Sequence, residues 1–412
     1  MAFQLPKGTK DYAFEEARAI TEIKKIIEQI YSEWGYEPLY TPAMEMLTVL
    51  NAKSGEEITG QIFRIEDSDY GLRFDLTVGS ARFIASSSIP KPYKRYSLGL
   101  VWRREEPQKG RLREFYQLDA DIFGTSSPKA DAEIIAMGCE ILEKLGFKEY
   151  QVIINNREIL SALIKKYKQG QNENKILRLL DKTDKVGEDE IKKELEKIQL
   201  QKELIEKLFS LDMKTASEIC PDGYKRIKEI VEILLNDYNI NQEKIKVDFS
   251  LARGLAYYTS TVFEIKLTKE FGSVAGGGRY DELLSLYGKG EPAVGISFGL
   301  ERLLLLMQKQ NKENKIKQKK PIYIVSTQDE YYKYAIELAR KLRSNGIEAI
   351  CDITERKLSG KLEYASINFY YVVIIGKEEV EKKEYTLKNL LNGEQKKLGF
   401  EELVGELEKK VR

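Results

Sequence analysis

Two runs of β-forming residues, separated by too little chain for a crossover, limit what this sequence can fold into. The runs are YSLGLVWR at 96–103 and REFYQLDADIF at 113–123, and both are rich in aromatic and apolar residues. Parallel strands need a connection of about a dozen residues or more, usually a helix. The interval 104–112 is shorter, polar and interrupted by Pro and Gly. The sequence therefore predicts an antiparallel sheet.

Helical and strand-like patterns continue on both sides of this pair. Apolar residues at helical spacing predict helices over 14–33, 129–145 and 299–308. The segment 36–41 is expected to be extended up to Pro42. Further short strands are expected at 62–67, 70–77, 150–154 and within 245–267. A stretch dominated by Leu, Ile, Lys and Glu, at about 160–245, predicts an insertion of several short helices.

The last part of the chain has a different pattern. The Lys-rich segment 309–320 is typical of a solvated linker. Beyond it, strands at 321–326, 347–352 and 370–376 alternate with helices at 329–344, 360–366 and 399–411, which predicts a compact α/β domain with a mixed or parallel sheet. The expected fold class is α+β. It consists of an antiparallel-sheet domain over 1–308 with the helical insertion, the linker 309–320, and the α/β domain 321–412.

Composition narrows the chemistry that this chain can perform. Its 67 Lys and Arg residues balance 66 Asp and Glu residues, so a nucleic acid would have to bind at a local patch. Cys139, Cys220 and Cys351 are widely spaced, and the chain contains no histidine. Histidine-based triads are thereby excluded, and we expect no metal site built by the protein alone. An enzyme of this kind would work through fixed charge and positioning, or through carboxylate, Lys, Tyr or Cys groups.

The sequence shows no sign of export or of membrane insertion. Its apolar runs are far shorter than the ~20 residues of a membrane helix. The N-terminal MAFQLPKGTKDY lacks the apolar stretch of a signal peptide. We therefore expect a cytoplasmic protein with no membrane partner.

The loop between the two central strands carries the most suggestive chemistry. Arg103 and Glu105 are two residues apart and would share a face on a strand, where a simple ion pair is one interpretation. The following stretch adds Arg111 and Arg113 and then Gln117, Asp119 and Asp121 at every second position. Arginines at the mouth of a loop and polar groups on the returning strand favour a polyanion bound beside a small polar ligand.

Three further motifs are each open to two interpretations. In RGLAYYTSTVFE, Arg253 precedes Tyr257 and Tyr258. One tyrosine should face the core and the other a cleft, because strand neighbours alternate, and an ordinary core-and-surface pair is the other interpretation. The glycines of AGGGRYD fit a tight turn or a backbone that passes close to a ligand. Arg302, in the first turn of an apolar helix, fits an ion pair or a phosphate contact.

Taken together, these motifs resemble the histidyl-tRNA synthetase family of class II aminoacyl-tRNA synthetases. PKGTKDY resembles the family's N-terminal signature, YTPAMEM its first motif, VWRREEPQKGRLREFYQLDADIFG its second and AVGISFGLERL its third. RGLAYYTSTVFE and AGGGRYD resemble two stretches peculiar to the histidine-specific enzymes, and LRFDLT and DKTDKVG also match. The segment VVIIGKEEVEKKEYTLKNLLNGEQ resembles the anticodon-binding domain. The resemblance covers essentially the whole chain.

The resemblance implies a reaction, ligands and residue roles. The reaction is activation of L-histidine by ATP, with Mg²⁺ bound to the nucleotide, and transfer to tRNA(His) by a homodimer formed through the first motif around Pro42. Arg103 and Arg253 would be catalytic, both at the α-phosphate. The implied ATP-binding residues are Arg103, Glu105, Arg111, Arg113 and Arg302. The implied histidine-binding residues are Asp75, Thr77, Arg103, Gln117, Asp121, Arg253, Tyr257 and Tyr258.

Two departures and two rival interpretations accompany this resemblance. Ala256 stands where the family usually has an acidic residue, and Gly79 stands where Pro is often found. One rival is the catalytically inactive, synthetase-like regulatory subunit of ATP phosphoribosyltransferase, which typically lacks the anticodon-binding domain. The other is a class II synthetase for a different amino acid, against which RGLAYY and GGGRYD are the main evidence.

Overall fold

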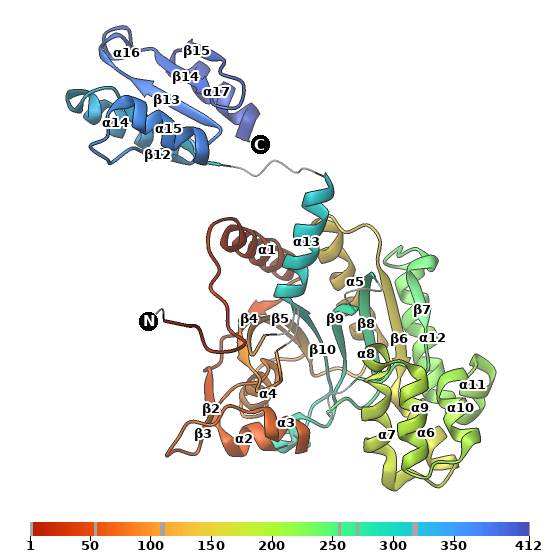
Figure 1. The fold of residues 1–412 in the computed structure, drawn as a ribbon. Helices are drawn as coiled ribbons and strands as arrows, with labels where there is room; N and C mark the ends of the chain where they lie inside the picture. Colours follow the sequence, from red (N-terminus) through yellow and green to blue (C-terminus); the bar gives the residue numbers. More distant parts are fainter. Residues whose placement is uncertain are drawn as a thin grey trace. The chain divides into compact units, whose positions relative to one another are not determined.

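The computed structural model describes residues 3–52, 56–107, 112–253, 257–268, 272–314 and 320–411. The chain divides into two compact units, Met1–Gln310 and Asn311–Arg412 (Figure 1). The expected α+β fold class is confirmed: a large, mainly antiparallel sheet with helices forms the first unit, and a smaller mixed sheet forms the second.

An eight-stranded sheet is the framework of the first unit. Its strands lie in the order β1-β4-β5-β10-β9-β8-β6-β7. They comprise β1 (Glu37–Pro38), β4 (Tyr93–Trp102), β5 (Glu114–Phe123), β10 (Ala293–Gly299), β9 (Gly272–Arg279), β8 (Thr261–Thr268), β6 (Gln151–Asn156) and β7 (Ile245–Val247). Neighbours are antiparallel except at the edges, where β1 runs parallel to β4 and β7 to β6. The predicted antiparallel pair is confirmed as β4 and β5.

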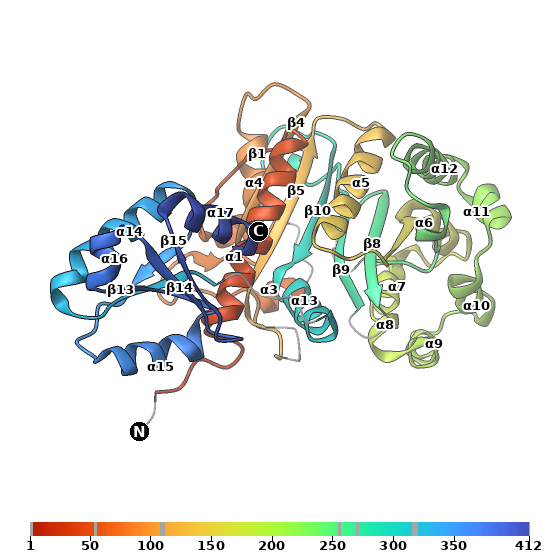
Figure 2. The same ribbon diagram turned by 90° about the horizontal axis from the view of Figure 1, so that it is seen from above.

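One face of this sheet carries the main core. Helices α1 (Phe14–Glu33), α5 (Pro128–Lys144) and α13 (Leu300–Asn314) pack their apolar stripes against it, and Figure 2 shows α1 and α5 along the same side. Leu118, Ala120 and Ile122 of β5 point into this core and are almost fully buried. Because side chains alternate along a strand, the residues between them lie on the opposite face.

Several expected elements differ from the structure. The run 62–67 is no strand, since only Arg64 bridges to Gly71. The run 70–77 contributes only β3 (Tyr70–Leu72), which pairs with β2 (Met44–Met46). Short helices take much of the rest of this region: α2 (Leu47–Asn51), α3 (Glu56–Gln61) and α4 (Thr77–Ala85). Helix α13 extends to Asn314 and so enters the expected linker, because Lys, Gln and Glu are good helix formers.

Short helices fill the region expected to be a helical insertion. They are α6 (Arg157–Lys166), α7 (Glu173–Leu180), α8 (Thr183–Val186), α9 (Glu188–Lys197), α10 (Lys202–Ser210), α11 (Met213–Ile219) and α12 (Pro221–Asn236). Leucine and isoleucine side chains from α6, α7, α9 and α10 form a core cluster of their own. This separate core explains how so many marginal helices are held together.

The second unit is an α/β domain with a five-stranded mixed sheet in the order β12-β11-β13-β14-β15. Its elements are β11 (Ile322–Ser326), α14 (Tyr332–Ser344), β12 (Ala349–Cys351), α15 (Leu358–Asn368), β13 (Tyr371–Ile375), α16 (Lys377–Lys382), β14 (Tyr385–Asn389), β15 (Gln395–Leu398) and α17 (Phe400–Val411). The sequence patterns did not predict α16, β14 or β15. In the described ranges of both units, no helix combines the length and apolar character needed to cross a bilayer.

Candidate functional site

The second face of the eight-stranded sheet is polar along its middle strands. Gln117, Asp119 and Asp121 alternate on β5, and each is at most 8% exposed. Their partners on β10 are Gly299, Ser297 and Gly295 respectively, and directly opposed residues share a face of the sheet. A Cβ atom at Gly295 would overlap the Asp121 carboxylate, so this glycine makes room for the buried acid.

The three consecutive glycines form part of strand β9 and not a tight turn, so the turn interpretation is wrong. Gly276, Gly277 and Gly278 pair with β10 on one side and β8 on the other. A Cβ at Gly276 would lie 2.6 Å from Cζ of Arg253, and one at Gly278 would lie 2.5 Å from the carbonyl oxygen of Thr261. These glycines therefore allow close packing of the adjacent backbone and of the Arg253 guanidinium.

Asp121 is held by two buried partners that the sequence analysis missed. Arg95, on β4 directly opposite, forms an ion pair with it, and the Tyr280 hydroxyl donates a hydrogen bond to it. Both partner side chains are at most 1% exposed. The alternation KRYSLGL on β4 could have placed Arg95 on the polar face, and Tyr280 ends the AGGGRY motif.

Asp75 and Thr77 lie where the chain enters α4. The Asp75 Oδ1 atom accepts a hydrogen bond of 2.9 Å from the backbone N–H of Val78, which caps this helix. Both Asp75 and Thr77 are buried. Gly79 follows on the same helix, and a Cβ there would lie 2.8 Å from Thr41 Oγ1. A side chain at position 79 would therefore crowd Thr41.

Tyr257 and Tyr258 are both buried, and the premise that they alternate on a strand is wrong. They precede β8, where strand alternation does not apply. Their rings meet at a centroid distance of 5.0 Å, and the Tyr257 ring lies 5.6 Å from that of Tyr280. Tyr257 interacts with Thr77 and Tyr258 with Arg253, so both tyrosines border the polar face. Ala256 lies outside the described residues.

A chain of hydrogen bonds connects Arg253 with Arg302. Arg253 Nη1 pairs with Glu264 Oε1 at 2.6 Å, and the Ser273 hydroxyl donates to the same carboxylate. Arg302, at the start of α13, donates to the Ser273 carbonyl oxygen. The Arg302 side chain also lies beside Gly299, which opposes Gln117. The two arginines therefore approach the same face of the sheet.

Arg103 lies just beyond the end of β4, so the strand argument that placed it with Glu105 on one face is wrong. Its Nε donates to the Phe74 carbonyl oxygen at 2.9 Å, and its guanidinium lies 5.1 Å from the Phe115 ring centroid. Phe115 is two residues before Gln117, which puts Arg103 at the same polar face. No carboxylate in the described part of the chain pairs with Arg103.

The rest of this loop is only partly described. Arg113 Nε donates to the Glu105 carbonyl oxygen at 3.0 Å, and its backbone N–H donates to the Gly8 carbonyl oxygen at 2.7 Å. The N-terminal PKGTKDY segment thus packs on the base of the loop. Arg111 lies outside the described residues.

Burial shifts the pKa values of the acids on the polar face. Burial raises the pKa of Asp119 to about 7, with Arg95 opposing the shift and Asp121 adding to it. The pKa values of Asp75 and Asp121 are also raised, again mainly by burial. Burial opposes the charge of Arg253, but Glu264 beside it raises the pKa of this guanidinium above its ordinary value. The polar face thus holds arginines that stay charged, together with acids whose ionised form is stabilised when a cation lies beside them.

Three buried oxygen atoms on this face have neither a hydrogen bond nor an ion pair within the described part of the chain. They are Asp75 Oδ2, Gln117 Oε1 and Asp119 Oδ1. An unpaired buried polar atom costs about 1–3 kcal/mol, and a native protein tolerates few of them. Three acceptors together indicate a binding site for a ligand that carries several N–H donors.

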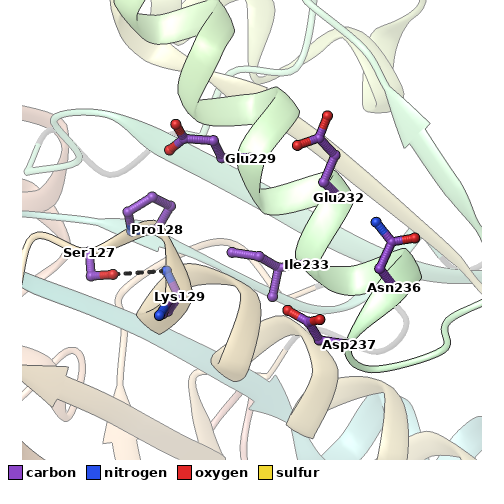
Figure 3. Close-up of a pocket in the computed structure, with 8 residues that line it drawn as sticks. All are labelled: Ser127, Pro128, Lys129, Glu229, Glu232, Ile233, Asn236 and Asp237. Atoms are coloured by element: carbon purple, nitrogen blue, oxygen red, sulfur yellow. Dashed lines mark hydrogen bonds between the residues drawn. The ribbon is translucent and has the colours of Figure 1, made fainter.

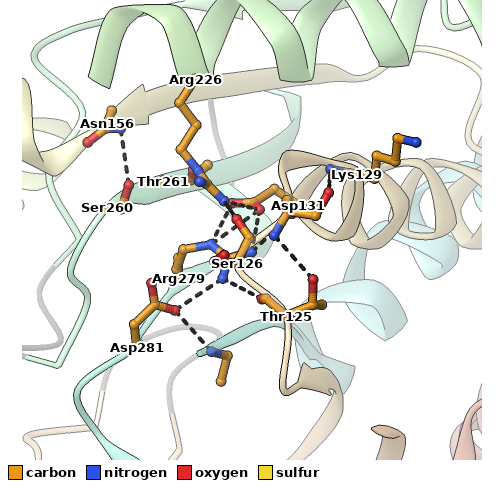
Figure 4. A network of polar contacts seen from close by, with 12 residues as sticks. Thr125, Ser126, Lys129, Asp131, Asn156, Arg226, Ser260, Thr261, Arg279 and Asp281 are labelled. Atoms are coloured by element: carbon orange, nitrogen blue, oxygen red, sulfur yellow. Dashed lines mark hydrogen bonds and ion pairs between the residues drawn. The ribbon is translucent and has the colours of Figure 1, made fainter. Parts of the chain in front are cut away.

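A buried ion-pair network supports the site from behind (Figure 4). Arg279 Nη2 pairs with Asp131 on α5, and Arg226 from α12 pairs with the same carboxylate at 2.8 Å. Arg279 also pairs with Asp281 at 3.1 Å. Since Tyr280 lies between Arg279 and Asp281, this network fixes the segment that presents Tyr280 to Asp121.

A hollow of about 300 Å³ lies elsewhere in the first unit, between the N-terminal end of α5 and α12 (Figure 3). Its lining comprises Ser127, Pro128, Lys129, Glu229, Glu232, Ile233, Asn236 and Asp237. None of the unpaired buried atoms lies there. The chemistry of the polar face is absent from this hollow, so it is not the candidate site.

Comparison with known proteins identifies the family. A family model described as histidyl-tRNA synthetase matches residues 8–303, and an anticodon binding domain model matches residues 321–410. The chain belongs to the histidyl-tRNA synthetase family. A histidine–tRNA ligase of Finegoldia magna is 36% identical over 427 residues, covering 97% of this chain and 98% of that protein. One of Nanoarchaeum equitans is also 36% identical, over 97% of both chains.

Solved structures of histidyl-tRNA synthetases share this fold. The enzyme of Nostoc sp. PCC 7120 superposes with a TM-score of 0.85 and 28% identity, covering 100% of both chains. A Bacillus halodurans protein titled ATP phosphoribosyltransferase regulatory subunit/histidyl-tRNA synthetase has a TM-score of 0.76 at 24% identity. At that identity the likeness concerns the fold alone.

Proposed function

We propose that this member of the histidyl-tRNA synthetase family activates L-histidine with ATP and transfers the histidyl group to the 3′ end of tRNA(His). The observation that carries the proposal is the combination on one sheet face of unpaired acceptors with guanidinium groups. The acceptors suit an ammonium and a ring N–H, and the guanidinium groups suit carboxylate and phosphate oxygens. Histidine and ATP together provide these four groups.

The histidine substrate would occupy the acceptor side of this face. Asp75, Thr77 and Gln117 would receive its α-ammonium group, and Asp121, Tyr257 and Tyr258 would surround its imidazole. Asp121 already accepts from Tyr280 and pairs with Arg95, which fixes its orientation for a ring N–H. A site built on such hydrogen bonds can reject analogues that lack them by ~10⁴–10⁵, so no editing step is required.

ATP would occupy the guanidinium side. Arg103 would contact the α-phosphate and the substrate carboxylate, Glu105 the adenine end, and Arg111, Arg113 and Arg302 the outer part of the nucleotide. Arg253 would be the second cation at the reacting phosphate. Arg103 and Arg253 are thus the proposed catalytic residues.

Mg²⁺ is proposed to arrive bound to ATP. The Glu264 carboxylate next to Arg253 already accepts from Arg253 and Ser273, so phosphate oxygens would be its main ligands. The ion would supply additional positive charge at the phosphates. The chain itself contributes fixed guanidinium groups at the phosphates.

The first step needs no general base. An oxygen of the histidine carboxylate, ionised at neutral pH because its pKa is about 3.5, attacks the α-phosphorus. The bond from this phosphorus to the bridging oxygen breaks, and pyrophosphate leaves with the electron pair. Negative charge grows on the phosphoryl oxygens, where preorganised cations stabilise it without reorganisation. In the second step, a ribose hydroxyl of tRNA attacks the activated carbonyl, AMP leaves, and the hydroxyl proton would pass to an oxygen of the adenylate phosphate.

The partners of the chain follow the same proposal. Exposed Tyr40, Met44 and Met46 flank Pro42, and exposed Tyr70 pairs with Met46 across β2 and β3. These side chains support a homodimer formed through this segment. In the second unit, Tyr364 is 40% exposed and lies under the Arg356 guanidinium at 5.3 Å. Aromatic and guanidinium planes suit stacking of unpaired RNA bases, which supports tRNA binding there. We propose that the protein works in the cytoplasm.

Amino-acid-dependent pyrophosphate exchange tests the proposal. Exchange should depend on histidine and not on threonine or proline, and tRNA(His) should accept labelled histidine. A regulatory subunit would catalyse neither reaction, and a synthetase of other specificity would respond to another amino acid. Absence of histidine-dependent exchange by a folded protein would refute the function.

A further inference from the structure

We infer that Asp119 is a further histidine-binding residue, whose buried carboxylate receives the substrate α-ammonium group together with Asp75 and Gln117. This inference rests on the proposed function and extends it to a residue that the family resemblance leaves without a role. An ammonium group has three N–H donors. Asp75 Oδ2, Gln117 Oε1 and Asp119 Oδ1 are the three unpaired acceptors that match them.

The position of Asp119 supports this role. It lies between Gln117 and Asp121 on β5, on the face away from the main core, and is 2% exposed. Gln117 Nε2 donates to the Ser297 hydroxyl at 2.8 Å, and Ser297 also interacts with the Asp119 carboxyl. Tyr257 interacts electrostatically with both Asp75 and Asp119. Asp119 is therefore within the proposed amino-acid subsite and not behind it.

The balance of charge around Asp119 favours a cationic ligand. Several ionisable groups interact electrostatically with it. On its own side of the sheet they are Arg95 of β4, Asp121 of β5, Arg73 just after β3, Asp75 before α4, and Tyr257 and Tyr258 before β8. Tyr31 of α1 lies on the core side of the sheet. Arg95 is committed to Asp121 by a direct ion pair, and Arg73 donates to two backbone carbonyl oxygens. Within the described residues no ion pair neutralises Asp75 or Asp119, and an ammonium group would supply a positive charge next to both.

Binding should therefore be coupled to the ionisation of Asp119. Burial raises its pKa to about 7 in the ligand-free protein, so the carboxyl changes its protonation state near neutral pH. An ammonium group stabilises the ionised carboxylate. Histidine should consequently bind more tightly as the pH rises from 6 to 8, with loss of the Asp119 proton.

The test compares the full-length wild type with Asp119→Asn in histidine-dependent pyrophosphate exchange at pH 6 and pH 8. At pH 8 the substitution should raise the KM for histidine by at least about tenfold, the effect of losing a hydrogen bond to a charged group. At pH 6 the ratio should fall below about threefold, because the wild-type carboxyl is then protonated. The KM for ATP should change by less than about twofold at either pH. The substrate imidazole titrates equally in both assays, so it cancels in the ratio.

Asp237→Asn, at an exposed aspartate of the same unit, is the matched control and should leave the pH profile of KM unchanged. A KM ratio that is near one, or that is equal at pH 6 and pH 8, would overturn the assignment while leaving the proposed function intact. If Asp119→Asn does not fold, Asp119→Ser removes the same charge with a smaller side chain and gives the same comparison. A wild type without histidine-dependent exchange would instead refute the proposed function itself.

Discussion

The substitution Gly276→Ala tests whether the position of the Arg253 guanidinium controls the rate. A Cβ at residue 276 would lie 2.6 Å from Arg253 Cζ, whereas ordinary contacts begin near 3.4 Å. The guanidinium must therefore move by about 1 Å, with its charge unchanged. A shift of about 1 Å at a reacting group can reduce the rate by about 100-fold, which corresponds to about 2.7 kcal/mol of barrier.

We expect the kcat of histidine-dependent pyrophosphate exchange to fall by about 100-fold in Gly276→Ala, with KM values for histidine and ATP within about threefold of wild type. Arg253→Ala should likewise depress kcat more than it raises either KM. Because Gly276 acts through Arg253, the double variant should be no slower than Arg253→Ala alone. A folded Gly276→Ala protein with wild-type kcat would refute the reasoning, and weakened KM values with kcat intact would make Arg253 a binding group only.

Gly277→Ala is the matched contrast for stability. A Cβ at residue 277 would overlap the carbonyl oxygen of Gly295 and lie 2.5 Å from Phe263 Cζ. The backbone of a central strand cannot yield as a flexible side chain can, so this variant should lose stability. Gly276→Ala should instead stay near the wild-type melting temperature, since alanine restricts the unfolded chain more than glycine does.

Three further outcomes follow from the site. Asp121→Ala should abolish histidine-dependent pyrophosphate exchange while ATP binding, measured by calorimetry, persists; unchanged exchange would contradict its role. Asp131→Ala leaves Arg279 and Arg226 without their shared partner. The free energy of unfolding measured in urea should therefore fall by about 3–5 kcal/mol. A fall of less than about 1 kcal/mol would exclude a structural role for Asp131. The raised pKa values of Asp75, Asp119 and Asp121 mean that the folded protein holds more protons than the unfolded chain between pH 4 and about 7. Their contribution to the free energy of unfolding should therefore fall as pH rises through that window, and less so in Asp119→Asn; an equal fall in both proteins would contradict this attribution.

Local patterns predicted the elements whose structure depends on local sequence. Helix 14–33 has the predicted limits because its isoleucines recur at helical spacing. The pair β4–β5 followed from alternation and from the short connection. The same alternation predicted that Gln117, Asp119 and Asp121 share one face of their strand. For these residues, spacing along the chain alone determines which side chains lie together.

Tertiary packing determines the positions of the residues that the sequence analysis misplaced or missed. Three adjacent glycines favour a turn on local grounds, yet strand pairing on both sides and the Arg253 side chain need their lack of Cβ atoms. Arg95, Glu264 and Tyr280 partner residues that are distant in sequence or on another strand. Alternation along β4 could have placed Arg95 on the polar face, but no local pattern brings Glu264 next to Arg253 or Tyr280 next to Asp121.

The absence of histidine from the chain is consistent with the charges on the polar face. Imidazole is useful where a proton must be taken and returned near neutral pH, but the attacking carboxylate already lacks its proton. The barrier comes instead from negative charge that grows on phosphoryl oxygens. A guanidinium is protonated at every physiological pH, so it stabilises that charge without losing its proton. The acids on the same face have pKa values raised by burial, so their ionisation is coupled to binding of the cationic part of the substrate. On this argument the groups that set the rate are insensitive to pH near neutrality, and the pH dependence of the reaction should appear mainly in the KM for histidine.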